Sequence, residues 1–303
     1  MITAIGISVI DHIMVIDGFK VDEGSFHCEQ YLIEGGGMAA TALCTASKLG
    51  AHTRLFSRTG DDVNAQLIIE GLKKFGVDTA GIVKATDKHS TICIVLVDSR
   101  TGEKQFYSER IKSAYTGKIT LDSTLLEGTR VLLLDGHWID EALKAARWAR
   151  KNNIPVVADF KRNYDDLDKL FPYIDYFIIP HFFACELAGK CNTDVLLRKL
   201  ASLQPGIPVI TMGSEGGVYL ADGEIRRYKA FPVNCVDSTG AGDAFHGAFC
   251  YFLPHGLDIG RCLELSSATG ALNCRALGGR AALPTRSELS AFLSANGSHS
   301  QFP

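Results

Sequence analysis

The sequence lacks any cysteine pair with the spacing of a redox or metal-binding motif. Its nine cysteines are scattered over 303 residues, none forms C-x-x-C, and their odd number argues against a framework of disulfides. It also lacks any run of five or six like charges, and the formal net charge is only −3. These absences exclude a small disulfide-stabilised domain and argue against nucleic acid or an anionic membrane as the main partner.

No basic segment precedes the apolar N-terminal stretch MITAIGISVIDHIMVIDG, and Asp11 interrupts it. This stretch is therefore expected to form a buried strand, not a signal peptide or a membrane span. A reduced, cytoplasmic protein that uses cysteine as a small buried hydrophobic residue agrees with all of these features.

Short apolar runs rich in β-branched residues alternate with helix-like segments along most of the chain. This alternation predicts an α/β fold: one doubly wound, mostly parallel sheet with helices on both faces. The length suits a single domain, residues 1–303. The predicted strands are residues 3–10, 53–60, 130–136, 154–160, 176–180 and 207–213, and the predicted helices are residues 38–49, 64–75, 140–151, 193–203 and 243–253.

Two stretches depart from this alternation. HSTICIVLVDSRTGEKQFYSER (89–110) has period-two patterning on both sides of SRTGE, which is typical of a hairpin. Residues 13–34 are expected to be extended segments joined by turns. Together, residues of about 13–34 and 89–112 are predicted to form a small antiparallel β lid that closes over a site and excludes water. A peripheral hairpin without such a role is the alternative.

VDSTGAGDAFHGAF (236–249) contains three glycines within eight residues. It does not match the dinucleotide fingerprint G-x-G-x-x-G, because Phe245 stands where the third glycine is needed. It does not match a P-loop either, because Ala248 stands where the lysine is needed. What remains is a glycine turn that leads into a helix beginning near Asp243.

The first amides of a helix lack intrahelical partners, and small residues before them allow an anion such as phosphate to come close. A carboxylate beside a phosphate site would repel it, so Asp243 needs a reason to be there. A general base for a hydroxyl that attacks phosphorus is one reason. Simple helix capping by Asp243 is the alternative.

A second glycine loop, IEGGGMAATALCTASKLG (33–50), precedes a helix of small residues. Small side chains allow the backbone to approach a ligand, or else permit tight packing between helix and sheet. Asp11 follows the first predicted strand, and in open α/β sheets the ligand crevice lies beyond the carboxyl ends of the strands. Asp11 is thus either an acceptor for polyol hydroxyls or a turn residue.

These features, in this order, resemble the ribokinase-like (pfkB) carbohydrate kinase family. Residues 6–11 resemble the family's first strand with its sugar-binding aspartate, GGGMAATA its first signature, and DSTGAGD its second, D-T-x-G-A-G-D. SRTGDD, ITMGSEGG and CRALGGRAALP extend the resemblance over almost the whole chain. GGG-x-AATA, GAGD-x-FHGA and GGRA make it closest to the ketohexokinase and sulfofructose kinase branch.

The resemblance implies roles for residues around both glycine loops. Asp243 would be the catalytic base that takes the proton from a sugar hydroxyl. The anion hole for the transferred phosphoryl group would be formed by the amides of Gly240, Ala241 and Gly242. The sugar hydroxyls would be contacted by Asp11, Gly36 and Gly37.

For the second substrate, the resemblance implies ATP with Mg²⁺, the metal being held mostly through phosphates and water, as magnesium prefers. Relatives also bind a monovalent cation such as K⁺, which here would lie near Asp237 and the loop around Gly278. The implied nucleotide site is lined by Thr211, Gly213 and Gly216, with Ser267 beside the adenine.

The chain departs from the family pattern at three positions. Ala40 stands where the first signature commonly has asparagine. His181 and Ala184 replace the Asn and Glu of the P-N-x-x-E motif, which normally helps to organise magnesium, water and phosphate. Ketohexokinases also lack this motif, so its loss does not exclude a kinase.

Comparison with ketohexokinases indicates two cations near the transferred phosphoryl group, Arg110 in the lid and Lys161 just after the strand that ends at Asp159. Ordinary surface charge is the alternative for each. His246 lies three residues after Asp243, but no further metal-ligand motif accompanies it, so it is interpreted as a packing residue or a partner behind the site.

Sulfofructose kinases grip a sulfonate with basic or amide residues where this chain has Ser25, Ser108 and His137. We therefore expect either a substrate without a sulfonate group or a site that binds this group differently. His137 and Trp138 are candidates for the altered pocket, and packing beneath the lid is their alternative.

The sequence thus predicts an ATP-dependent kinase that phosphorylates a hydroxymethyl group of a sugar or sugar derivative, such as a ketose. Its partner is a small-molecule sugar, and the resemblance implies a homodimer formed through the lid. A nucleoside kinase of the same fold is the first alternative, which thermal shifts with adenosine against fructose or ribose would separate. A catalytically weak sugar- or nucleotide-binding protein is the second, which predicts binding without ATP turnover.

Overall fold

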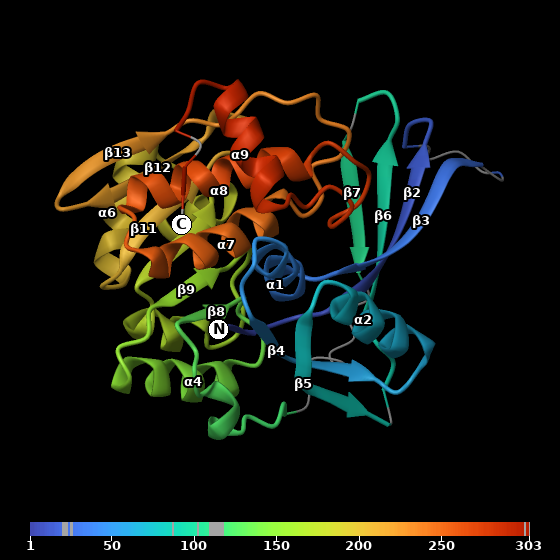
Figure 1. The fold of residues 1–303 in the computed structure, drawn as a ribbon, viewed down its shortest axis with the longest axis horizontal. Helices are drawn as coiled ribbons and strands as arrows, with labels where there is room; N and C mark the ends of the chain where they lie inside the picture. The colour runs from blue at the N-terminus through green and yellow to red at the C-terminus, as the bar shows by residue number, and fades with distance from the viewer. Residues whose placement is uncertain are drawn as a thin grey trace.

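Two sheets organise the chain (Figure 1). The computed structural model describes residues 1–19, 24, 27–86, 88–101, 103–108, 118–299 and 301–302. The larger sheet has nine strands in the order β13-β12-β11-β10-β9-β8-β1-β4-β5. Seven are parallel, namely β1 (Ile2–Ile5), β4 (Thr53–Gly60), β5 (Val77–Ala85), β8 (Val131–Leu134), β9 (Val156–Asp159), β10 (Tyr176–Pro180) and β11 (Ile207–Thr211). An antiparallel hairpin of β12 (Gly217–Ala221) and β13 (Glu224–Tyr228) completes one edge.

Helices cover both faces of the nine-stranded sheet (Figure 1). Alternate strand residues face opposite sides, so Leu133 belongs to one hydrophobic core and Leu132 and Leu134 to the other. The first core is closed by α1 (Met38–Lys48), α2 (Val63–Lys74), α7 (Ala241–Phe252), α8 (Ile259–Asn273) and α9 (Arg286–Ala295). The second is closed by α4 (Ile139–Lys151), α5 (His181–Ala188) and α6 (Thr193–Leu203). The predicted doubly wound, mostly parallel α/β fold is confirmed.

The predicted single strand at residues 3–10 is wrong. The chain leaves β1 after Ile5 and enters the second sheet at Val9. Between them, a side chain at Gly6 would collide with the carboxylate of Asp135, and that carboxylate accepts a hydrogen bond from the amide of Ile7 at 2.6 Å. The backbone is therefore satisfied by a side chain at this point, which permits the change of sheet.

The second sheet has four strands in the order β3-β2-β6-β7. They are β2 (Val9–Ile16), β3 (Cys28–Gly36), β6 (Ile92–Asp98) and β7 (Lys104–Ser108). β6 and β7 pair as an antiparallel hairpin within the stretch where the sequence predicts one. Asp11 lies in β2, so the expectation that it ends the first strand is also wrong.

The two faces of the second sheet differ in character. The register aligns Asp11 with Cys93 and Val15 with Val97 and Lys104, so Asp11 and Lys104 lie on one face. That face also carries a small buried cluster of Ile13, Val15, Val95 and Val97. The opposite face carries side chains that are 40–54% exposed: Tyr31, Ile33, Ile94 and Tyr107.

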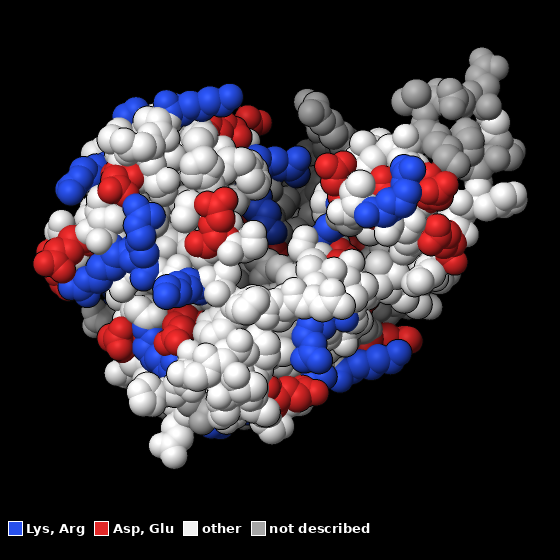
Figure 2. All heavy atoms as spheres, turned by 90° about the horizontal axis from the view of Figure 1, so that it is seen from above, with Lys and Arg blue, Asp and Glu red and all other residues white. Residues whose placement is uncertain are grey.

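The molecular surface is hollowed between the part built on the nine-stranded sheet and the part built on the four-stranded sheet, and charged side chains of both signs stand around the hollow (Figure 2). Among the described residues, no helix combines the length and the apolar character needed to cross a membrane.

Candidate active site

The start of α7 offers a site for an anion. Gly240 precedes the helix with φ 72°, and a Cβ there would lie 2.6 Å from the carbonyl oxygen of Gly279, so only glycine fits. A Cβ at Gly242 would meet nothing within 4 Å. No intrahelical carbonyl can reach the amide of Gly242 or Asp243. The amide of Ala241 donates to the carbonyl oxygen of Ser238 at 3.3 Å, so the amides of Gly242 and Asp243 are the chief donors that this helix start offers to a phosphoryl group.

The loops around this helix start are fastened to each other. Asn273 Nδ2 donates to the carbonyls of Thr239 and Gly279, each at 3.1 Å. The carboxylate of Asp237 accepts from the amide of Thr239 at 2.8 Å and from the amide of Gly278 at 2.9 Å. These hydrogen bonds hold the loops of the anion site in one arrangement, and preorganised donors of this kind are the condition for effective electrostatic stabilisation.

Asp243 lies in the first turn of α7 and is only 8% exposed. The ammonium of Lys161, two residues beyond β9, lies 2.5 Å from Asp243 Oδ1. Burial acts to lower the pKa of Lys161, but the carboxylates of Asp243 and Asp159 outweigh it and raise that pKa above its usual range. The predicted base and one predicted cation therefore stand in direct contact.

A buried carboxylate and an imidazole lie behind this pair. Nδ1 of His246 is 2.7 Å from the carbonyl oxygen of Gly242, and Nε2 is 3.1 Å from that of Ile178. Both ring nitrogens therefore lie against backbone carbonyl oxygens. The fully buried Asp159 lies 3.4 Å from Nδ1, and burial raises the pKa of its carboxyl, an effect that His246 and Lys161 oppose. His246 thus holds the backbone of the anion site.

Asp11 faces the same region from the second sheet and is also 8% exposed. A side chain at Gly36 would collide with its carboxylate, which explains the glycine. Burial raises the pKa of Asp11 to about 7; Arg280 opposes this, and the nearby carboxylates of Asp243 and Glu34 add to it. No described residue donates a hydrogen bond to this carboxylate, so its oxygens remain available to hydroxyl groups.

Residues 1–286 match the family described as pfkB family carbohydrate kinase. The chain belongs to this family. The crystal structure of a candidate ribokinase from Agrobacterium tumefaciens has a TM-score of 0.90 at 25% identity and covers 98% of each chain. Arabidopsis thaliana ribokinase, complexed with ribose and ATP, has a TM-score of 0.82 at 21% identity over 96% of this chain and 98% of that one. The nucleoside kinase of Methanothermobacter thermautotrophicus is 23% identical over 88% of this chain and 87% of its own.

The predicted family and enzyme class are thereby confirmed, whereas the ketohexokinase and sulfofructose kinase branch stays a prediction. Sequence reasoning missed two further residues that build this kinase's site. Arg280 is buried and donates to Thr41 Oγ1 at 3.0 Å and to the carbonyl of Gly36 at 2.7 Å. Asp135 is fully buried and accepts from His137 Nδ1 at 2.9 Å. The available signals were a charged residue inside GGRA and an aspartate directly after a buried strand.

His137 and Trp138 lie between β8 and α4 and are both buried. The His137 ring packs 4.8 Å from the ring of Tyr164. Trp138 takes a left-handed conformation with φ 50° where α4 begins, a strained backbone for a bulky residue. These contacts fix both side chains at the carboxyl end of β8.

The predicted nucleotide residues lie on two segments, the turn after β11 and helix α8. Thr211 ends β11, Gly213 begins the turn that follows, and a side chain at Gly216 would collide with the carbonyl of Tyr228. Ser267 on α8 donates to the carbonyl of Lys229 at 3.0 Å. Gly216 and Ser267 therefore contact the same short segment of the kinase, just beyond β13.

The remaining predicted positions lie outside the described residues, at the end of β7, or within the two cores. Arg110 and Ser25 lie outside the described residues. Ser108 is exposed at the end of β7. Ala40 and Ala184 are fully buried in α1 and α5, where each packs in a core.

No three His, Cys, Asp or Glu side chains in the described part of the kinase gather closely enough to hold a metal ion. Magnesium commonly uses one or two carboxylates together with substrate phosphates and water. The residues present fit a metal of this kind, which the nucleotide would bring with it.

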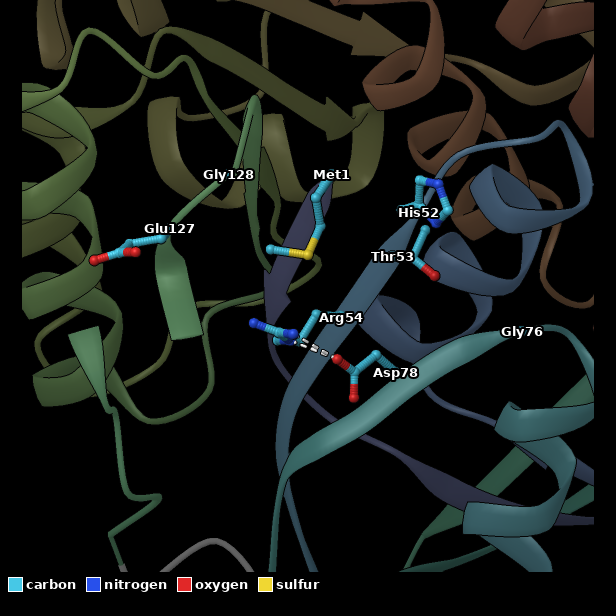
Figure 3. A pocket seen from close by; sticks show the side chains of 8 residues that line it. All are labelled: Met1, His52, Thr53, Arg54, Gly76, Asp78, Glu127 and Gly128. Carbon is cyan, nitrogen blue, oxygen red and sulfur yellow. Dashed lines mark hydrogen bonds and ion pairs between the residues drawn. The ribbon is translucent and has the colours of Figure 1, made fainter. Parts of the chain in front are cut away.

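A pocket of about 410 Å³ lies at the opposite edge of the nine-stranded sheet, among the amino ends of β1, β4 and β5 (Figure 3). Inside it, Arg54 and Asp78 form an ion pair at 2.6 Å. None of the predicted site residues lines this pocket. The chemistry of the kinase is therefore assigned to the carboxyl ends of the parallel strands.

Proposed function

We propose that this kinase transfers the γ-phosphoryl group of ATP to a hydroxymethyl group of a sugar or sugar derivative held by Asp11. The observation that carries this proposal is the position of Asp243. It stands at an open helix start that suits a phosphoryl group, and it is close enough to Asp11 to raise the pKa of that carboxyl. The similar ribokinase with bound ribose and ATP supports the same pair of substrates.

In the proposed reaction, Asp11 and the backbone of Gly36 and Gly37 orient the sugar. Asp243 takes the proton of the hydroxymethyl group while its oxygen forms a bond to phosphorus and the bond to the ADP oxygen breaks. The amides of Gly240, Ala241 and Gly242 stabilise the charge on the transferred oxygens. Mg²⁺ bound with ATP supplies neutralisation of phosphate charge.

Lys161 has two partners in this scheme. Its ammonium lies 2.5 Å from Asp243 Oδ1. A transferred phosphoryl group at the helix start would compete for the same ammonium, which leaves Asp243 free to accept a proton. Thr211, Gly213, Gly216 and Ser267 line the nucleotide site in this proposal, and His137 lies at the sugar side.

The four-stranded sheet is proposed to act as the lid over the sugar, because its inner face carries Asp11 to the site. Its outer face exposes the apolar side chains of Tyr31, Ile33, Ile94 and Tyr107. An exposed apolar patch of this kind marks an interaction surface, and it supports a homodimer formed through the lid. The nine free thiols support a cytoplasmic location.

A coupled assay of ADP release over ketoses, aldoses and nucleosides tests the function, with the Asp243→Asn variant as control. We expect turnover with a sugar and a loss of about 10²–10⁴ in kcat in the variant, the usual contribution of a general base. Turnover with nucleosides alone would favour the nucleoside kinase alternative. Ligand binding without ADP release, or full activity of Asp243→Asn, would refute the proposed reaction.

A further inference from the structure

A lysine of the four-stranded sheet is buried against the loop that leads into α7. The ammonium of Lys104, the first residue of β7, lies 2.8 Å from Asp237 Oδ1, 2.7 Å from Ser238 Oγ and 3.3 Å from Thr239 Oγ1. Its three N–H donors thus face three oxygens. The side chain is only 11% exposed, and the carboxylate of Asp237 is fully buried.

Asp237 depends on this lysine for a counter-charge. Burial acts to raise the pKa of Asp237, but hydrogen bonds from Lys104 and from the amides of Gly278 and Thr239 outweigh it and hold the pKa below its usual range. Asp237 is therefore an anion at neutral pH. A buried carboxylate without a cation is strongly unfavourable, so removing Lys104 would leave a charge that must be compensated.

This is the place where the family resemblance puts a monovalent cation. A potassium ion and an alkylammonium head are of similar size and both are bound by oxygen atoms. A second cation at Asp237 would share the carboxylate with Lys104 and be repelled by it at short range in a buried setting. The residues present therefore do not fit a bound K⁺ while Lys104 is in place.

We propose that Lys104 takes the place of the monovalent cation and orders the anion hole with its own charge, so that this kinase works without K⁺. The inference rests on the proposed function only in giving the anion hole a role in phosphoryl transfer. Lys104 is a positioning residue, since it binds Ser238 and Thr239, which directly precede Gly240.

The four-stranded sheet contacts these loops at its other edge as well. Glu34 on β3 accepts a hydrogen bond from the amide of Arg280 at 3.1 Å. Arg280 follows the loop whose Gly278 amide binds Asp237. Both edge strands of the sheet, β3 and β7, are thus tied to the paired loops around residues 237–240 and 278–280.

Thermal unfolding and initial rates, measured in KCl, NaCl and tetramethylammonium chloride at equal ionic strength, test the proposal. The natural protein should give the same Tm in all three salts without any substrate, and rates equal within about twofold once a substrate is known. Lys104→Met should lower the Tm, because breaking a buried charge pair destabilises the fold. It should also lower kcat by about 100-fold in NaCl, because the anion hole loses the charge that orders it. KCl should then restore activity at least partly and raise the Tm more than NaCl does.

Two variants guard the result. Lys84→Met removes a lysine on β5 whose pair with Asp61, at 3.5 Å, is about half exposed, and it should change neither Tm nor salt response. Lys104→Arg keeps the charge and should stay insensitive to K⁺. If Lys104→Met fails to fold, this variant still tests the proposal, because a response to K⁺ in it would contradict the prediction.

A natural protein with a higher Tm and rate in KCl than in NaCl would overturn the proposal, as would a folded Lys104→Met variant with full activity in NaCl. The substrate-free Tm reports on K⁺ even if no sugar is turned over, so failure of the proposed function is distinguishable from failure of this inference.

Discussion

The two glycine-rich loops are similar in sequence, but their glycines have different surroundings. At 35–37, every glycine is pressed against another group: Gly35 against Arg280, Gly36 against Asp11, and Gly37 against the backbone of Ile7. At 240–242, Gly240 is equally confined, but Gly242 faces open space. In the first loop, other groups of the protein fill the space that side chains would need, whereas in the second loop the space at Gly242 is open.

The largest expected effect is the loss of kcat on substitution of Asp243, which we compare with the substitution of Asp11. Asp243→Asn should lower kcat by about 10²–10⁴ with the KM for ATP little changed, because it removes the base and not the anion site. Asp11→Asn should act mainly on the KM of the sugar, since it alters contacts to the ground state. Steady-state kinetics with both substrates varied gives the comparison. The same pattern in both variants would mean that the two carboxylates share one role.

A matched pair of glycine substitutions tests the difference between the loops directly. Gly36→Ala should lower stability by about 1–3 kcal/mol, because the new methyl group collides with Asp11. Gly242→Ala should fold with unchanged or slightly higher stability, because alanine favours a helix by about 1 kcal/mol over glycine. It should nevertheless lower kcat, because the methyl group enters the space for the phosphoryl oxygens. Denaturant melts and initial rates of both variants distinguish these outcomes; an active Gly242→Ala enzyme would contradict the assignment of the anion site.

A dependence of stability on pH is expected from Asp11, the carboxylate packed against Gly36. Asp11 has a pKa of about 7 in the folded protein and 3.8 as its ordinary value. The folded state therefore binds more protons than the unfolded state between these values, and the free energy of unfolding falls as pH rises from about 4 to 7. Each unit of difference corresponds to about 1.4 kcal/mol at most. Denaturant melts from pH 5 to 8 should show a smaller fall in Asp11→Asn, and the KM for the sugar in the natural protein should rise below pH 7.

Much of the fold could be predicted because short stretches of the sequence carry the patterns of strands, helices and turns. Alternating apolar strands and amphipathic helices indicated the doubly wound sheet, and both glycine loops announced helix starts. The junction at Gly6 could not be found this way, because β1 and the start of β2 are both buried and form one apolar run. Only Asp135, far along the chain, shows why the backbone turns there.

The site residues also divide into those marked by a local motif and those that depend on contacts between distant segments. Asp243, Gly240 and Gly242 belong to one contiguous motif, so their neighbourhood could be predicted from sequence. Arg280 and Lys104 join segments that are distant in the chain, and no local pattern marks either as different from a surface charge. Their roles depend on the tertiary packing that buries them.

The alternation of side chains in β7 makes the length of the β6–β7 turn a functional quantity. Asp98 and Glu103 close this turn with a backbone hydrogen bond of 2.9 Å, and that closure sets which residues of β7 face inward. One residue more or fewer between them would move every β7 side chain to the other face. Gln105 and Tyr107 would then point toward the catalytic loops and Lys104 toward solvent. The length of a surface turn, which makes no contact with substrate in the proposed mechanism, is therefore under the same constraint as the active site.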